Sequence, residues 1–302
     1  MQIITNKAQK ELKSHGDYQL PLLVSHECLS RYETGSFLWH WHPEIELTLI
    51  QEGEIHYRVN HQSFHLKEGQ ALFCGAGALH TGSRIANHDC RYISVTFDPR
   101  LIYGYENSLI QEHCVLPLLQ APELSALALD GSEAWHQEGR NCILRLISLY
   151  EGRPAAWELD ILLSLLSFWK LLFLHMRPTA CLSVNDAQNY SRIRSILAYI
   201  GVHYSERITL EDIGRELHLC PGECSRLFSR YMNQPLFEFI LEYRIEKSLP
   251  LLADSSITIT QAAAGTGFND PNYFSKTFAR FKGCSPSVYR KRAALGGKIK
   301  TI

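Results

Sequence analysis

The sequence predicts an α+β protein, with a β-barrel in its N-terminal part and an all-α domain in its C-terminal part. Short strand-like runs fill residues 21–110, whereas the apolar period becomes helical from about residue 134. The last hundred residues contain one helical unit twice, and Phe228 and Phe278 mark its repeat of 50 residues. With 302 residues, 45% of them hydrophobic, the chain is long enough for two cores.

Residues 1–20 form a polar segment, which we expect to be a mobile arm that ends at Pro21. The arm lacks the apolar stretch of a signal peptide. The nine cysteines are an odd number and include no Cys-x-x-Cys pair. Free thiols in a reducing cytoplasm are the simplest explanation, and a redox-sensing pair of Cys220 and Cys224 is the alternative.

The barrel is predicted from short apolar or alternating runs that are separated by glycine, asparagine and charged turn residues. These runs are residues 46–50, 55–59, 63–66, 71–73 and 92–97. Residues 59–63 between two of them read as a hairpin turn. Regularly spaced short strands of this kind are typical of an all-β barrel or sandwich.

Residues 111–177 are predicted to be a helical dimerisation segment. Within it, residues 143–150 carry one apolar stripe, and residues 157–174 are densely apolar after a break at Gly152–Pro154. A membrane span is the rival interpretation, but Glu158, Asp160 and Lys170 interrupt the run. We therefore expect a buried helix whose excess apolar surface pairs with a second copy of the chain. The polar residues 178–189 would then be the linker.

Residues 190–292 are predicted to be a DNA-binding domain with two helix-turn-helix units, at about 209–231 and 258–281, followed by a tail at 293–302. Thr209 with Asp212, and Thr258 with Gln261, have the spacing of helix-capping pairs. Phe274, Phe278 and Phe281 form one apolar stripe of the last helix. A linking helix from Pro235 to Leu249 would span roughly 22 Å.

These motifs resemble the AraC/XylS-type family of bacterial transcription regulators. The resemblance covers about residues 190 to 292 and rests on segments 209–213, 225–228, 243–248, 267–276 and 285–286. It implies two recognition helices in successive major grooves of duplex DNA, roughly 34 Å apart. His218 departs from the pattern, because it stands where the family has glycine in the turn; histidine adopts a left-handed backbone at some cost.

The charge distribution agrees with one DNA-binding end. Residues 190–302 carry 16 Lys and Arg against 10 Asp and Glu, whereas residues 1–189 carry 14 against 21. We expect base contacts from Ser225 and Arg226 and phosphate contacts from Arg280 and Lys282. The full set of expected DNA-binding residues is Gly222, Glu223, Ser225, Arg226, Arg230, Pro271, Asn272, Ser275, Lys276 and Arg280.

The barrel contains a candidate site in His40, His42, Glu46 and His80. The spacing His-x-His, three residues, Glu, six residues and Gly53 resembles the first motif of cupin barrels, and Gly69, Gly77 and His80 partly match the second. His40 and His42 would lie on one face of a strand. Three imidazoles and a carboxylate suit a divalent transition metal, which these positions bind in metal-binding cupins.

Three interpretations of this cluster remain open: a metal site, a polar pocket for an effector such as a sugar, or histidines that satisfy one another. We predict a cytoplasmic, homodimeric regulator that binds double-stranded DNA under the control of a small molecule. The family resemblance implies activation, with RNA polymerase as a further partner. The alternative is a metal-dependent cupin enzyme whose helical part is a scaffold.

Overall fold

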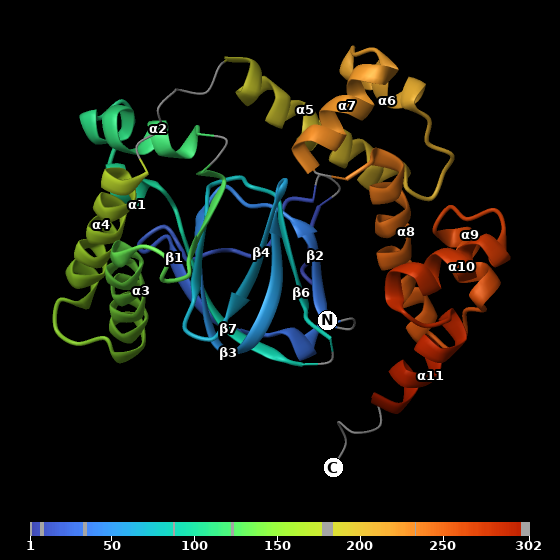
Figure 1. Cartoon of the computed structure of the whole chain (residues 1–302), viewed down its shortest axis with the longest axis horizontal. Helices are drawn as coiled ribbons and strands as arrows, with labels where there is room; N and C mark the ends of the chain where they lie inside the picture. The colour runs from blue at the N-terminus through green and yellow to red at the C-terminus, as the bar shows by residue number, and fades with distance from the viewer. Residues whose placement is uncertain are drawn as a thin grey trace. The chain divides into compact units, whose positions relative to one another are not determined.

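The computed structural model describes residues 2–6, 9–32, 35–86, 88–121, 124–176, 184–232 and 234–296. These residues form two compact units (Figure 1). Residues 2–6 and 10–189 belong to the first unit, which contains the β-strands, and the second unit begins at Tyr190 and is helical.

Eight antiparallel strands make up the sheet structure of the first unit. They are β1 (Leu22–Cys28), β2 (Ser36–His40), β3 (Ile45–Val59), β4 (Gln62–Lys67), β5 (Ala71–Cys74), β6 (His80–Arg84), β7 (Cys90–Phe97) and β8 (Ala126–Leu129). The strand order is β1-β7-β3-β5-β8, and β4 and β6 also pair with β3, while β2 pairs with β6. The predicted hairpin turn joins β3 to β4, where Val59 pairs with Gln62.

Strand β3 is one long strand, so the predicted separate strands at 46–50 and 55–59 are wrong. Its first part pairs with β5 and β7, and its second part pairs with β4 and β6. The register shifts between Ile50 and Glu52, and Gly53 has a φ of 80°. A Cβ at Gly53 would lie 2.2 Å from the carbonyl oxygen of Asp89. Glycine therefore allows β3 to bend and to connect both halves of the barrel.

The prediction that residues 111–177 form a helical segment is wrong for its first part. Residues 126–129 form β8, which pairs with β5 over Ala71 to Cys74, and short elements precede it. These are the α-helix α1 (Arg100–Tyr103), a π-helix (Gln111–Val115) and α2 (Leu116–Leu119). A four-residue strand at the edge of a sheet is specified by its neighbour and not by its own pattern, which explains the error.

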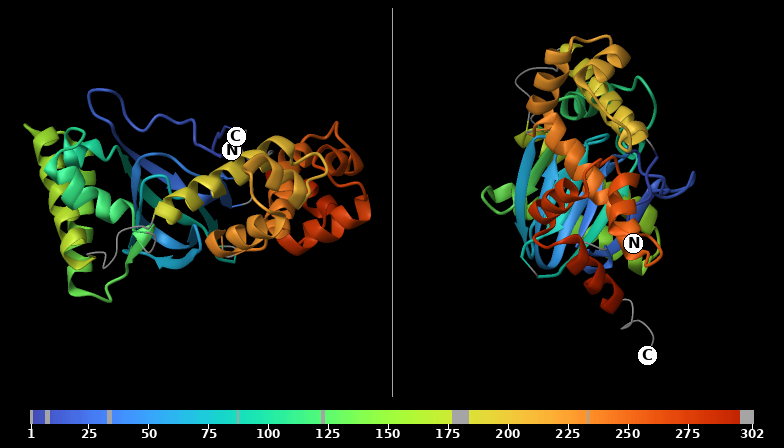
Figure 2. Two further views of the ribbon diagram at one scale, coloured as in Figure 1. Left: turned by 90° about the horizontal axis from the view of Figure 1, so that it is seen from above. Right: turned by 90° about the vertical axis from the view of Figure 1, so that its right-hand side faces the viewer.

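Helices α3 (Ala134–Gly152) and α4 (Trp157–His175) follow β8 and lie side by side (Figures 1 and 2). They bury Ile143, Phe168 and Trp169 against sheet residues such as Phe73 and Val95, which confirms the predicted buried helix. Within the described part of the chain, no helix is both long and apolar enough to span a membrane.

Residues 2–6 and 10–20 of the N-terminal arm form backbone pairs with one another and with the barrel, contrary to the expectation of a mobile segment. Thr5 and Glu11 form an antiparallel bridge, and Lys10 forms a parallel bridge with Trp41. The amide of Glu11 donates to the carbonyl of Trp41 over 2.9 Å. This pairing provides the backbone hydrogen bonds that the polar arm could not form alone.

The second unit contains the duplicated helices. Its elements are α5 (Val184–His203), α6 (Leu210–Leu217), α7 (Pro221–Met232), α8 (Leu236–Ala253), α9 (Ile259–Gly265), α10 (Pro271–Lys282) and α11 (Pro286–Gly296). Helix α5 already begins at Val184, so residues 184–189 of the predicted linker are helical, while residues 178–183 lie outside the described residues. Helix α8 has 18 residues and extends past the predicted end at Leu249 to Ala253, with Pro250 inside it and Leu252 fully buried.

Each helix-turn-helix unit has its own small core. In the first helix-turn-helix unit, Ile213, Cys224 and Phe228 are fully buried, and the Phe228 ring meets Phe239 of α8 edge-on. The second core contains Ala262, Ala263, Phe268, Phe274 and Phe278 with three residues of α8. Small alanines suffice on α9, because the phenylalanines fill the space between the helices.

Candidate functional sites in the barrel and on the recognition helices

The first helix-turn-helix unit begins at Thr209 with a reciprocal capping box. Oγ1 of Thr209 accepts from the amide of Asp212, and Oδ2 of Asp212 accepts from the amide of Thr209, each over 3.2 Å. Helix α6 ends at His218, which has the left-handed φ of 53°. This conformation turns the chain into α7, so the histidine takes the role that glycine has in the related motifs.

The second unit repeats this construction. Thr258 and Gln261 form the same reciprocal capping box, with distances of 2.8 and 3.1 Å. The turn contains Gly267 at a φ of 82°, where a Cβ would lie 2.5 Å from the carbonyl oxygen of Tyr204. Helix α10 starts with Asp270, whose side chain accepts from the amide of Asn272 over 2.8 Å. Local chemistry therefore fixes the start of the first helix in both units and of the recognition helix α10.

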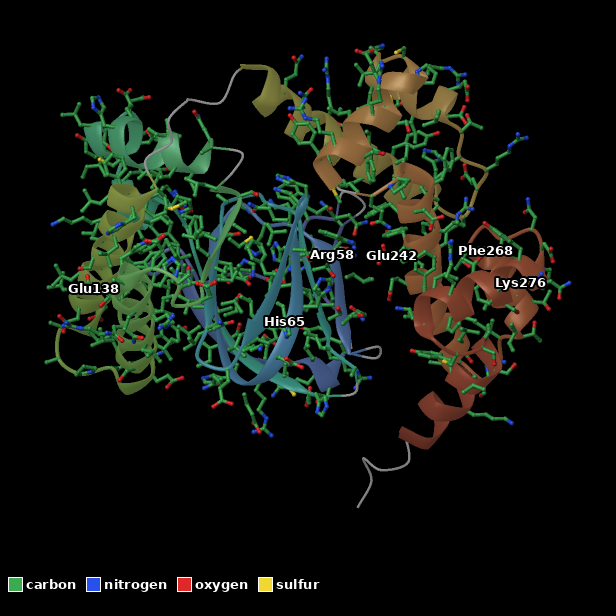
Figure 3. All side chains as sticks on the ribbon, viewed as in Figure 1. Arg58, His65, Glu138, Glu242, Phe268 and Lys276 are labelled. Atoms are coloured by element: carbon green, nitrogen blue, oxygen red, sulfur yellow. The ribbon has the colours of Figure 1, made fainter. Side chains whose placement is uncertain are left out.

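Most of the side chains predicted to meet DNA are accessible on α7 and α10. Arg226 and Lys276 occupy equivalent positions of the repeat, and both are exposed. Lys276 is labelled in Figure 3. The other exposed residues are Gly222, Glu223, Arg230, Asn272 and Arg280, and the partly buried ones are Ser225, Pro271 and Ser275. The Ser275 hydroxyl donates to the carbonyl of Pro271 over 2.9 Å. That hydroxyl must exchange this bond in order to reach a base.

Two cations near the end of α10 have partners within the protein. Nη2 of Arg280 lies 2.9 Å from the Glu238 carboxylate. The ammonium of Lys282 contacts Glu246, and only 14% and 12% of the two side chains are exposed. Burial raises the pKa of Glu246, whereas the charge of Lys282 lowers it. The ionised form of the Glu246 carboxylate therefore depends on Lys282. Lys282 therefore forms an ion pair between α10 and α8, in place of the phosphate contact that we expected.

The suggested redox pair in α7 is not supported by the geometry. Cys220 is exposed, whereas Cys224 is fully buried in the core of the first helix-turn-helix unit. Burial raises the pKa of the Cys224 thiol, which disfavours the reactive thiolate. Cys224 is best explained as a small core residue.

The barrel encloses a cavity of about 430 Å³, a size that suits a small organic ligand. Its wall combines aromatic rings with carboxylates and hydroxyls. The lining residues are Gln2, Ile3, Ile4, Glu11, Leu12, Lys13, His15, Ser25, Glu27, Tyr32, Phe37, His40, Glu46, Tyr57, Tyr92, Ser94 and Thr96. Of the four residues predicted for an effector, His40 and Glu46 line the cavity, whereas His42 and His80 do not.

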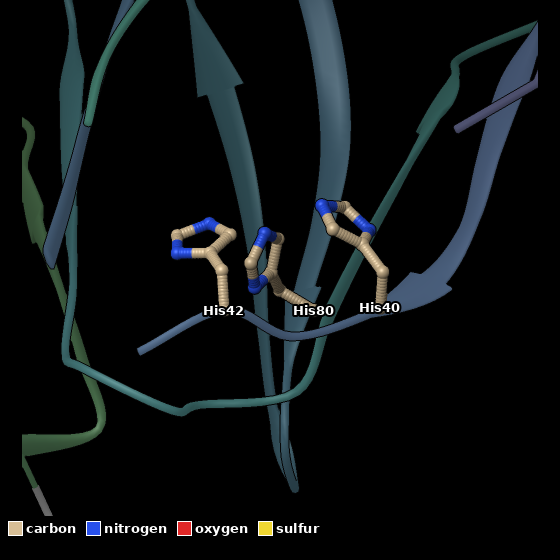
Figure 4. A group of neighbouring side chains, drawn as sticks. All are labelled: His40, His42 and His80. Carbon is tan, nitrogen blue, oxygen red and sulfur yellow. The ribbon is translucent and has the colours of Figure 1, made fainter. Parts of the chain in front are cut away.

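The structure brings the four predicted residues together, although not from one strand. Strand β2 ends at His40, so His42 lies beyond the strand, and His80 comes from the start of β6 (Figure 4). The ring centroids of His40 and His80 are 4.1 Å apart, and those of His42 and His80 are 5.0 Å apart. All three imidazoles are almost completely buried.

Burial and mutual repulsion make this cluster unfavourable for protonated histidines. Burial lowers the pKa of His40 well below its usual value, and the neighbouring His80 and His42 add to the effect. Burial also lowers the pKa of His80. For Glu46, burial opposes ionisation, but His42, His80 and a hydrogen bond from Thr48 hold the carboxyl pKa well below its usual range. The neutral imidazoles of His40 and His80 thus lie beside the ionised carboxylate of Glu46.

Sequence reasoning missed two groups of the arm that join this site. His15 Nε2 lies 3.2 Å from Glu11 Oε2, and His15 Nδ1 lies 3.4 Å from Glu44 Oε2. Burial lowers the pKa of His15, but the two carboxylates outweigh it and raise the pKa to about 9. Glu11 and His15 lie in a polar segment without periodicity, so the sequence contains no signal for this contact.

The fold and its two sites define a DNA-binding protein that senses a small molecule: a barrel with a ligand-sized cavity is joined to a duplicated helix-turn-helix domain. Comparison with known proteins leads to the same class. A profile for the AraC-like ligand binding domain matches residues 25–164, and a profile for a helix-turn-helix domain matches residues 213–292.

Several relatives match over most of their length. The HTH-type transcriptional regulator YdeC of Bacillus subtilis (strain 168) is 29% identical over 282 residues, which cover 93% of this chain and 96% of that protein. The melibiose operon regulatory protein of Escherichia coli (strain K12) is 22% identical over 262 residues, 83% of each chain. The raffinose operon transcriptional regulatory protein RafR of Pediococcus pentosaceus is 27% identical over 248 residues, 80% of this chain and 83% of that protein.

The chain belongs to the AraC-type family of transcription regulators, with a ligand-binding and a DNA-binding domain. The predicted regulator is confirmed, and the alternative of a cupin enzyme is not supported, because the family and the relatives are regulators and not enzymes. The helix-turn-helix domain implies binding to DNA, and the barrel implies a small-molecule effector.

Proposed function

We propose that a sugar binds in the barrel cavity and thereby changes the affinity of the two recognition helices for an operator. The observation that supports this proposal most directly is the composition of the cavity wall. The rings of Tyr32, Phe37, Tyr57 and Tyr92 lie beside the carboxylates and hydroxyls of the lining. Aromatic faces pack on the C–H faces of a sugar ring, while carboxylates and hydroxyls accept or donate to its hydroxyl groups.

The relatives support a particular group of sugars. Two of them are named for the melibiose and raffinose operons. Melibiose and raffinose both contain an α-galactosyl group, so we propose an α-galactoside as the effector class. Control then requires that the sugar bind one arrangement of the protein more tightly than another, because only differential affinity shifts a conformational equilibrium.

On DNA, we propose that α7 and α10 lie in successive major grooves. Ser225 and Arg226 would contact bases in one groove, and Asn272, Ser275 and Lys276 in the next. The 18 residues of α8 span about 27 Å, longer than predicted and closer to the 34 Å of one DNA turn. Arg230 and Arg280 would position the protein on phosphates, with Arg280 first leaving Glu238.

We further propose that the protein acts as a homodimer. Helix α4 buries one face against the sheet, yet it exposes leucines on its opposite side. Leu159, Leu163 and Leu166 are 64%, 58% and 42% exposed and follow at i, i+4 and i+7. A second copy of this helix offers the complementary apolar surface. The family resemblance also supports activation through RNA polymerase and a cytoplasmic location, where the DNA is found.

The experiment that tests the effector uses the full chain and an operator selected with it from a random DNA duplex library. Fluorescence anisotropy measures the operator affinity with melibiose, raffinose, and cellobiose as a β-linked control. We expect the two α-galactosides to change the affinity, and cellobiose to have no effect. The double variant Ser94→Ala and Thr96→Val removes two cavity hydroxyls and should weaken the sugar response, whereas Ser63→Ala on the outer hairpin should not. Equal responses to all three sugars, or none, would contradict the proposal.

A further inference from the structure

The three buried histidines of the barrel present their acceptor atoms to one another. Nδ1 of His40 lies 2.9 Å from the Leu38 carbonyl, and Nδ1 of His80 lies 2.9 Å from the Ala78 carbonyl. Nδ1 of His42 lies 3.2 Å from the Glu44 carbonyl. Because a carbonyl oxygen can only accept, each Nδ1 must carry the proton. Nε2 is therefore the ring nitrogen of each imidazole that offers a lone pair to a cation.

These lone pairs converge on one point together with a carboxylate. One ring nitrogen from each of His40, His42 and His80 lies within 4.8 Å of the others. Oε2 of Glu46 lies 3.4 Å from His42 Nε2 and 4.0 Å from His80 Nε2. Among the residues that the structure describes, both of these Nε2 atoms are buried without a hydrogen-bond partner. Acceptors that face acceptors in a buried site are unfavourable unless a cation lies between them.

The remaining oxygen of Glu46 is held in place from behind. Oε1 accepts from the hydroxyls of Thr48 and Tyr57, over 2.8 and 2.9 Å. Backbone carbonyls orient the imidazoles and two hydroxyls orient the carboxylate, which is the outer-shell arrangement that metal ligands require. Three imidazoles and one carboxylate suit a divalent transition metal such as Zn²⁺ or Co²⁺.

We propose that the barrel binds one divalent transition-metal ion through Nε2 of His40, His42 and His80 and Oε2 of Glu46, and that Glu11 of the arm faces the same ion from the cavity. Glu11 Oε2 lies 3.9 Å from His40 Nε2, and only 9% of the Glu11 side chain is exposed. His40 and Glu46 thus connect the ion to the cavity, and Glu11 approaches it from the arm. Binding of the ion thereby fixes residues 10–15 against the barrel.

This inference concerns the cavity of the proposed function, but its test uses neither DNA nor sugar, so the two can fail separately. The full chain is dialysed against Zn²⁺ or Co²⁺, and the bound metal is measured by mass spectrometry. We expect one ion per chain, with a visible Co²⁺ spectrum of low coordination number. X-ray absorption of the Zn²⁺ protein should show about three imidazole scatterers, a result that needs no variant.

Variants assign the ligands. His42→Ala and His80→Ala should abolish stoichiometric binding, whereas His65→Ala, which changes an exposed histidine of β4, should leave it intact (Figure 3). Circular dichroism checks that the variants are folded. A chain without stoichiometric metal, a Zn²⁺ site without imidazole scatterers, or folded His42→Ala and His80→Ala variants with unchanged binding would overturn the proposed site.

The role of Glu11 has its own readout. Trypsin cleaves after Lys10 and Lys13, which flank Glu11, and the ion should slow this cleavage. Glu11→Gln should retain one ion per chain with about 10–100-fold lower affinity and should lose the protection by metal. As a control, Glu52→Gln changes an exposed carboxylate of β3 that pairs with Arg91 and should retain the protection. Unchanged affinity and protection in Glu11→Gln would remove Glu11 from the proposal.

Discussion

Oε2 of Glu46 lies 3.4 Å from Nε2 of His42, while Oε1 of the same carboxylate accepts from Thr48 and Tyr57. One side of Glu46 is therefore fully satisfied, and its other side faces a nitrogen that is itself an acceptor. The ionised carboxylate is thus held by two hydroxyls on one side and remains open to a cation on the other.

Replacing Glu46 by glutamine should keep the first of these roles and remove the second. The amide oxygen can still accept from Thr48 and Tyr57, but an amide is a poor ligand for a metal ion. The lowered pKa of Glu46 means that its ionised form stabilises the folded protein, so we expect the metal-free variant to be about 1 kcal/mol less stable than the natural chain, and the stabilisation by Zn²⁺ to disappear. Thermal unfolding with and without Zn²⁺ measures both effects. Glu54→Gln, in an exposed pair with His65, is the control and should change neither.

Arg226→Ala should reduce operator affinity by about 1–3 kcal/mol and relax the base preference in one half of the operator. The reason is that Arg226 is exposed near the start of α7, where a guanidinium can bind guanine bidentately. Anisotropy titrations against the selected operator and its single-base variants measure the change. Arg215→Ala on α6, whose side chain is 79% exposed, should cost much less. An unchanged base preference in Arg226→Ala would remove α7 from the recognition scheme.

Lys282→Met should destabilise the second helix-turn-helix unit by about 3–5 kcal/mol, because it leaves the buried Glu246 without its cation. Lys276→Met, an exposed lysine of the same helix, should change stability by less than about 0.5 kcal/mol. Chemical denaturation of the full chain measures both values. Equal stability of the two variants would show that the Glu246 ion pair is of little importance.

The loss of stability in the Lys282→Met variant should also depend on pH. The pKa of Glu246 in the folded protein is raised above its ordinary value of 4.5, so the folded state holds the proton more tightly than the unfolded state. The stability due to this proton is fully present below pH 4.5 and is lost as the pH rises through the folded-state pKa. Removal of Lys282 raises this pKa further, so the variant should be less destabilised at pH 5 than at pH 8.

His218→Gly and Gly267→Ala should have opposite effects. His218 has a φ of 53°, which a histidine adopts only with strain, so glycine should stabilise the first unit by about 0.5–1 kcal/mol. Gly267 has a φ of 82° and no space for a Cβ, so alanine should destabilise the second unit by at least about 1–2 kcal/mol. Thermal unfolding compares them, and loss of stability in both variants would contradict the assignment of strain to His218.

Leu163→Glu should convert the proposed dimer into a monomer. Each leucine that leaves the interface forfeits about 1.5–3 kcal/mol of burial, so a single charged replacement should raise the dimer Kd at least tenfold. Analytical ultracentrifugation measures the association. Leu109→Glu changes a leucine that is 74% exposed outside α4 and should leave the dimer intact. Dissociation by both variants, or by neither, would contradict the α4 interface.

The sequence by itself determined the local features of this protein. The capping boxes of Thr209 and Thr258, the left-handed turn at His218 and the phenylalanine stripe of α10 depend on residues within a few positions of each other. Hydrogen bonds and packing over such short separations follow from backbone geometry, so their spacing in the sequence is sufficient to predict them. The two-domain organisation followed from the same periodicities.

Only the tertiary structure decided which distant groups meet. The bend of β3 depends on the carbonyl of Asp89 beside Gly53, and the short β8 depends on its partner β5. The contact of Glu11 with the histidine cluster and the pairing of Lys282 with Glu246 join charges that are far apart in the chain. Periodicity shows which face of an element is buried, but closure of the barrel and packing of the helices determine what that face contacts.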